Sequence, residues 1–215
     1  MCGIAGSRSR ESGFDLYQLN LSRGCYSSSV TCIYPNGHFI DKRFGILSLN
    51  DIPLNAEYYL FHSRGPTVET AEFNWDDNHP FCYGRFIVSH NGIIENANEL
   101  YGGNIGVDSR VVPYLIDKSL RYSPSYHIPS LVANVVSQLK GTFSLWIYDT
   151  TDKKIYITRN DTTLFNYGTE FSSSNPGYLI DVPQNQLLCF SPNDNTMKIC
   201  TSVISTVNKP KYFIP

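Results

Sequence analysis

The chain begins Met1-Cys2-Gly3-Ile4-Ala5-Gly6, and the reading of every other segment depends on this stretch. Removal of Met1, which is usual before a small residue, would leave Cys2 with a thiol nucleophile and a free α-amino group. Such an amine has a reference pKa of about 7.7–8.0, so part of it is neutral near pH 7 and can take the thiol proton. The alternative is that Cys2 is a small buried residue at the start of a strand over residues 2–7. These six residues alone leave both interpretations open.

Composition limits the classes of protein that fit. The 215 residues suit one domain, and 41% of them are hydrophobic against 17% charged, which is typical of a globular chain. The net charge of -2 gives no reason to expect nucleic acid binding. No apolar run approaches the ~20 residues needed to span a bilayer, so we expect no membrane association. We therefore expect a single domain over residues 1–215 in a cytoplasmic protein.

The cysteines indicate neither a metal site nor a redox motif. The chain has six of them, none in a C-x-x-C pair, and the histidines are not at metal-binding spacing. No secretory segment follows Met1, so we expect reduced thiols rather than disulfides. The sequence also lacks a phosphate-binding loop of the G-x-x-x-x-G-K type. We expect no metal and no cofactor.

Hydrophobic patterning predicts more strands than helices. Helices are expected over 14–21, from Asp108 to about 121, and from Ser130 to about 139, with a further one opening after residue 93. Strands are expected over 2–7, 30–34, 38–40, 58–62, 85–90, 142–148, 154–158, 177–180, 186–190 and 197–201, and residues 23–29 are expected to form a loop. Two stacked sheets flanked by helices are the architecture that fits this order.

Two segments at predicted strand ends carry groups suited to an amide substrate. Arg64 could bind a carboxylate through its planar fork, although an isolated arginine is more often a solvated surface residue. The side-chain amide of Asn91 and the backbone N–H of Gly92 could hold an oxyanion during acyl transfer, although Asn-Gly is also a common hairpin turn. Asp108 could accept a substrate ammonium, cap the following helix, or do both.

Six motifs in order along the chain resemble the class II glutamine amidotransferases, which are N-terminal-nucleophile hydrolases. The resemblance runs from residue 2 to about residue 175, which is most of the chain, and the spelling of the fourth motif is closest to the glucosamine-6-phosphate synthase branch. The motifs are Cys2-Gly3-Ile4-Ala5-Gly6, Arg23-Gly24-Cys25-Tyr26-Ser27-Ser28, His62-Ser63-Arg64-Gly65-Pro66-Thr67, His90-Asn91-Gly92-Ile93-Ile94-Glu95-Asn96, Gly106-Val107-Asp108-Ser109-Arg110 and Gly141-Thr142-Phe143-Ser144-Leu145.

The resemblance implies a fold, a reaction and a set of roles. The fold would be a four-layer αββα sandwich with two stacked, mainly antiparallel sheets. Cys2 would attack the side-chain amide of L-glutamine, form a γ-glutamyl thioester and release ammonia, with Asn91 and Gly92 holding the oxyanion. Arg64, helped by Thr67, would bind the α-carboxylate of glutamine, and Asp108 its α-ammonium.

The sequence also departs from the family pattern. Gly65-Pro66 replaces the family's Trp-Ala after the arginine, which makes the role of Thr67 less certain than that of Arg64. Family members usually carry a second domain that consumes the ammonia. Because the 215 residues contain one predicted domain, we expect a glutaminase subunit that passes ammonia to a separate synthase chain.

Two other functions remain open at this stage. The chain could be an N-terminal-cysteine amidase acting on another linear amide, although Arg64 and Asp108 favour an amino-acid substrate. It could also be a non-catalytic regulatory module with the same fold. The presence of Cys2, Asn91 and Gly92 argues against that module, whereas retention of Met1 would argue for it.

Overall fold

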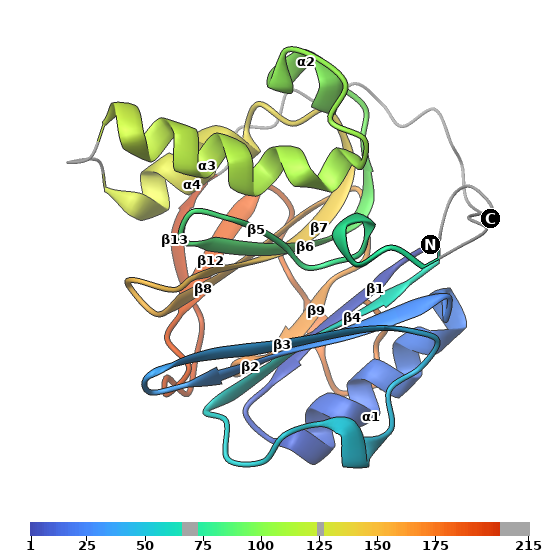
Figure 1. Cartoon of the computed structure of the whole chain (residues 1–215). Coiled ribbons are helices and arrows are strands. Elements are labelled where there is room, and N and C mark those ends of the chain that lie inside the picture. The colour runs from blue at the N-terminus through green and yellow to red at the C-terminus, as the bar shows by residue number, and fades with distance from the viewer. Residues whose placement is uncertain (66–72, 124–126, 203–215) are drawn as a thin grey trace.

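The computed structural model describes residues 1–65, 73–123 and 127–202. Two antiparallel sheets lie face to face, with helices on the two outer faces (Figure 1). The first sheet has seven strands in the order β11 (Ile180–Asp181), β9 (Phe165–Tyr167), β10 (Glu170–Ser172), β1 (Gly3–Ser7), β4 (Tyr58–Arg64), β2 (Ser27–Tyr34) and β3 (Gly37–Phe44). The second has six, in the order β13 (Lys198–Ser202), β12 (Gln186–Phe190), β8 (Lys154–Asn160), β7 (Gly141–Asp149), β6 (Phe86–Ile94) and β5 (Phe81–Tyr83).

The helices complete the four layers. The α-helices are α1 (Arg10–Asn20), α2 (Ala97–Tyr101), α3 (Val111–Tyr122) and α4 (Ile128–Val136), and the short 3-10 turns are η1 (Leu21–Arg23), η2 (Leu49–Asp51), η3 (Trp75–Asp77) and η4 (Asp108–Arg110). Helix α1 covers the first sheet, and α3 with α4 covers the second (Figure 1). The expected αββα sandwich is therefore confirmed.

Side-chain alternation along the strands builds three apolar layers. In β4, Phe61 faces α1 and packs on Tyr17, whereas Tyr58 and Leu60 face the second sheet. The layer between the sheets is centred on Trp146 of β7, which is fully buried and donates to the backbone carbonyl of Phe61. The third layer joins β6 and β7 to α3 and α4. Strands β1 and β6 thus lie on facing sheets, and their ends can share one site.

Three local predictions were wrong. Residues 27–29 belong to β2 rather than to a loop, because small buried serines let this strand pair with both β3 and β4. Asn91-Gly92 does not end its strand, since β6 continues to Ile94 and pairs with β7 throughout. Asp108 does not cap α3, which follows η4 and has Arg110 before its first residue.

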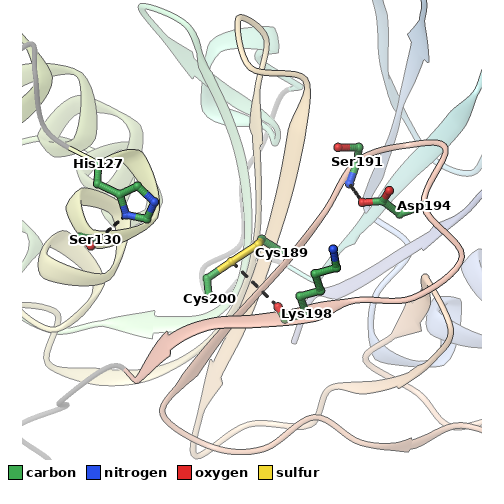
Figure 2. Close-up of a disulfide and its surroundings, with 7 residues drawn as sticks. All are labelled: His127, Ser130, Cys189, Ser191, Asp194, Lys198 and Cys200. Atoms are coloured by element: carbon green, nitrogen blue, oxygen red, sulfur yellow. Dashed lines mark hydrogen bonds between the residues drawn. A yellow bond between two sulfur atoms is a disulfide. The ribbon is translucent and has the colours of Figure 1, made fainter.

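The cysteines also differ from expectation. Cys189 and Cys200 form a disulfide between the neighbouring strands β12 and β13 (Figure 2), with their Cα atoms 6.0 Å apart. The turn that joins these strands is closed by a hydrogen bond from the Ser191 backbone N–H to the carboxylate of Asp194. The other four cysteines are free thiols, as predicted.

Candidate active site

Cys2 lies immediately before β1, one of the inner strands of its sheet. Cys2 is partly buried, and its thiol faces the carbonyl of Gly65, with 3.9 Å between Sγ and O. Burial raises the pKa of the Cys2 thiol above its ordinary value, and Gly65, the chain's N-terminal charge and Arg64 offset part of that rise. A buried thiol of this kind needs a nearby base before it can act as a nucleophile.

Backbone packing holds the segment around Cys2. A Cβ atom on Gly24 would lie 2.2 Å from the backbone nitrogen of Gly65, and one on Gly65 would lie 2.3 Å from the carbonyl oxygen of Met1. The segments carrying Met1, Gly24 and Gly65 therefore approach one another backbone to backbone. Glycine is needed at both positions because only a residue without a side chain permits this approach.

The carbonyl of Cys2 is held by two side chains. Arg23 Nε donates to this oxygen at 2.9 Å. In the amide orientation that satisfies its neighbours, Asn91 Nδ2 also donates to it at 2.7 Å, while Asn91 Oδ1 accepts from Arg23 and from Ser144. Asn91 has two amide N–H donors, so one remains for a substrate oxygen. Sequence reasoning placed Asn91 near Cys2, but it did not identify Arg23 as a contact of Cys2.

Gly92 is in β6, at a position where its N–H can face away from β7. The N–H of Ile94, two residues later, donates to Asp108 Oδ2 at 2.7 Å, and that of Glu95 donates to Lys140 on the β7 side. Backbone N–H groups alternate along an antiparallel strand, so the N–H of Gly92 shares the direction of the one on Ile94. In the described residues β5 pairs with β6 only as far as Val88, which leaves this edge open near Gly92.

Arg64 ends β4, and its guanidinium is available to an anion. Its Nη1 donates to Asn78 Oδ1 at 2.8 Å, and its Cζ lies 5.8 Å from the ring centroid of Tyr26. Among the described residues, no carboxylate lies within 4.0 Å of it. Asn78 thus orients the guanidinium without neutralising it, which is the arrangement that a bidentate carboxylate contact requires.

Asp108 opens η4 beside the end of β6. One carboxylate oxygen accepts from the Ile94 N–H, and the other accepts from the backbone N–H and hydroxyl of Ser109. About 31% of its side chain stays exposed, so lone pairs remain for a ligand donor. The structure therefore brings Cys2, Arg64, Asn91, Gly92 and Asp108 to one region, whereas Thr67 lies outside the described residues.

Three buried histidines lie behind this region, and sequence reasoning assigned them no role. The rings of His62 and His79 are in contact, with centroids 4.1 Å apart and planes tilted by 30°, and His90 Nδ1 lies 2.8 Å from the hydroxyl of Ser109. Burial lowers the pKa of His62 to about 3 and holds that of His79 well below its ordinary value, so both rings are neutral at pH 7. Within the described residues, no set of histidine, cysteine and acidic side chains is arranged to hold a metal ion.

The chain is similar in sequence to curated proteins that are named as glutamine-dependent aminotransferases. The chain is 28% identical over 182 residues to glutamine–fructose-6-phosphate aminotransferase from Pyrococcus horikoshii, a match covering 76% of this chain and 30% of that protein. The enzyme of the same name from Thermococcus kodakarensis is 27% identical over 203 residues, covering 83% and 33%. The chain is homologous to class II glutamine amidotransferase domains. It spans about a third of the length of these curated relatives, and no family model matches it.

Solved structures support the fold of this amidotransferase homologue. Glutamine phosphoribosylpyrophosphate amidotransferase from B. subtilis superposes with a TM-score of 0.70 at 14% identity, covering 92% of this chain and 49% of that one. A glutamine aminotransferase class-II domain protein from Silicibacter pomeroyi gives a TM-score of 0.52 at 12% identity, covering 93% and 99%. At such identities the likeness shows the fold alone. No helix among the described residues is long and apolar enough to cross a membrane.

Proposed function

We propose that the chain is a glutaminase that converts glutamine and water into glutamate and ammonia. The observation that carries this proposal is the position of Cys2 beside an amide donor, a guanidinium with no carboxylate partner among the described residues and a partly exposed carboxylate, contributed by Asn91, Arg64 and Asp108. The homologous aminotransferases are named for glutamine, which supports the same substrate here.

The chemistry follows from the groups present. Once Met1 is removed, the α-amine of Cys2 takes the thiol proton, and the sulfur attacks the carboxamide carbon of glutamine. Asn91 and Gly92 donate to the oxyanion that forms, an interaction whose loss typically costs ~10²–10³ in rate. The C–N bond then breaks and the amine returns its proton to the leaving ammonia. Water cleaves the thioester to release glutamate and restore the thiol.

Substrate recognition would use the two ends of the amino-acid backbone. Arg64 binds the α-carboxylate in our proposal, and Asp108 accepts from the α-ammonium. Thr67 assists Arg64 on the strength of the sequence motif alone, since it lies outside the described residues. This pair of charges favours glutamine over linear amides that lack an α-amino acid group, which is the main alternative substrate class.

Covalent labelling tests the nucleophile. The purified protein is analysed by intact mass before and after incubation with 6-diazo-5-oxo-norleucine, a glutamine analogue that traps such thiols. We expect loss of Met1 and one adduct, absent in Cys2→Ala and retained in Cys25→Ala, since Cys25 is another free thiol. Retained Met1 with no adduct would overturn the glutaminase proposal and favour the regulatory module.

A substrate comparison tests the role of Arg64. Wild type should hydrolyse glutamine far faster than its α-amide derivative, which lacks the α-carboxylate. Arg64→Met should lose this preference by raising KM for glutamine, with little change for the derivative. Equal preference in both proteins would show that another group selects the substrate.

We also propose that the ammonia passes to a separate synthase in the cytoplasm, with residues 1–215 acting as the glutaminase domain. The relatives are about three times as long as the region that matches this chain, which leaves room in them for a further domain that uses the ammonia. Ammonia released freely at neutral pH would become ammonium, which is a poor nucleophile, so a docked acceptor is favoured. Full glutaminase activity of the chain alone, with no amination enzyme recovered in a pull-down, would contradict this.

A further inference from the structure

A cavity of about 620 Å³ opens at one edge of the sandwich, and the proposed glutaminase chemistry does not use it. It lies where β3, the outer strand of the first sheet, approaches β5, the outer strand of the second, with η3 and the start of α3 completing its wall. None of Cys2, Arg64, Asn91, Gly92 or Asp108 lines it. Its volume falls within the roughly 300–1,000 Å³ of small-molecule sites.

Five aromatic rings line the cavity. They come from four different elements, and several remain open to water: about 47% of Trp75 and 40% of Tyr101 are exposed. The aromatic lining residues are Trp75, Phe81, Tyr83, Tyr101 and Tyr114. Rings left exposed in a concave wall favour a ligand with a flat apolar body, because covering them removes apolar surface from water.

Two cations lie over one of these rings. Lys42 Nζ is 5.8 Å and Arg110 Cζ is 5.5 Å from the ring centroid of Phe81. Arg110 is paired with Asp77 at 3.0 Å. Lys42 has only about 9% of its surface exposed and donates to the backbone carbonyls of Asn78 and Trp75, without a carboxylate within 4.0 Å among the described residues.

Among the described residues, no carboxylate contacts the largely buried ammonium of Lys42 directly. Burial lowers the pKa of this ammonium, and the nearby Cys82 and Asp76 offset part of that fall. Asp76 also lines the cavity and Asp77 pairs with Arg110, so these four charged groups sum to a formal charge of zero. The two backbone carbonyls that accept from Lys42 leave its ammonium one further N–H donor for an anion in the cavity. A phosphate, with several oxygens, can accept from both cations at once.

We propose that this cavity is a second binding site, for a small ring-bearing organic phosphate of the size of a nucleoside monophosphate. The phosphate contacts Lys42 and Arg110, and the ring system packs on the aromatic wall that includes Trp75 and Tyr101. The proposal does not rest on the glutaminase function, because binding here is measured without turnover.

The fluorescence of Trp75 reports on the cavity directly. The chain has two tryptophans, and Trp146 is fully buried in the layer between the sheets, so an added ligand acts on the Trp75 signal. Adenosine 5′-monophosphate is the probe, with adenosine and inorganic phosphate as its two halves. We expect a saturable change with the whole probe and at least tenfold weaker binding of each half.

Variants test separately how much the Lys42 charge and the aromatic rings contribute to binding of the probe. Lys42→Met should weaken binding of the probe by about tenfold, which is about 1.4 kcal/mol. Lys42→Arg should retain most of the affinity, and Lys140→Met, a lysine outside the cavity, should bind like wild type. If Lys42→Met fails to fold, Tyr101→Ala tests the ring wall on its own and should weaken binding several-fold. No saturable signal, inorganic phosphate as tight as the whole probe, or wild-type affinity in folded Lys42→Met would each overturn the proposal.

Discussion

The buried histidines predict that the fold loses stability on mild acidification. Burial lowers the pKa of His62 in the folded state to about 3, against about 6.5 in the unfolded chain. Between these two values the unfolded state binds a proton that the folded state does not. Stability therefore rises with pH in this window and falls as the pH drops below 6.5.

The size of the effect follows from the same two values. For His62, lowering the pH from 7 to 5 costs about 2 kcal/mol of unfolding free energy, because pH 5 is still well above the folded pKa. His79, whose pKa also lies well below its usual range because it is buried, should act in the same direction. Among the described residues, neither ring nitrogen of His79 has a hydrogen-bond partner, so replacing this side chain by an apolar one removes the titration without breaking a described bond.

Urea denaturation at several pH values between 5 and 7 measures the effect. In His79→Leu the unfolding free energy should fall less between pH 7 and pH 5 than it does in wild type, because one buried histidine no longer titrates on unfolding. His127→Gln, a change at an exposed histidine, should leave it unaltered. An identical pH dependence in His79→Leu and wild type would refute the idea that burial keeps His79 neutral.

Three further changes test the site. Gly65→Ala should cost about 1–3 kcal/mol of stability by thermal denaturation, because its Cβ would strike backbone, whereas Gly103→Ala, which faces open space, should cost little. Arg23→Met removes a donor from the Cys2 carbonyl, so it should lower kcat/KM for glutamine by about tenfold with little change in KM. A rise confined to KM would instead place Arg23 in substrate binding. Asp108→Asn should raise KM for glutamine by about tenfold or more in steady-state assays, and an unchanged KM would exclude contact with the α-ammonium.

Local patterning predicted the layers well, because strand and helix periodicities are properties of short segments. The strands around the hairpin at Asp149 and the helix over Val111–Tyr122 follow directly from their apolar spacing. The boundaries failed where contacts far along the chain decide them. Ser28 lies in a strand because its hydroxyl meets that of Tyr17 at 2.6 Å inside the sandwich, and its polarity alone indicated a loop.

Asn91-Gly92 shows the same limit at the site. The dipeptide has the composition of a tight turn, and the apolar residues after it suit a helix as well as a strand. The register with β7, in which Asn91 lies opposite Ser144, keeps the chain extended through both residues. Pairing with a partner about fifty residues away cannot be read from the dipeptide itself, which is why the motif was more informative than the local propensity.

The packing of the first residues against Gly65 sets an order of events during synthesis. Met1 and Gly65 meet only after the ribosome has added the 63 residues that separate Cys2 from Gly65. At about 5–20 residues per second, that interval is roughly 3–13 s. An aminopeptidase that removes Met1 must bind the chain terminus in its active site. The terminus is therefore most accessible to that enzyme before Met1 packs against Gly65. In the proposed mechanism Cys2 can act only once Met1 has been removed, so slower excision would leave a fraction of chains folded and inactive with Met1 in place.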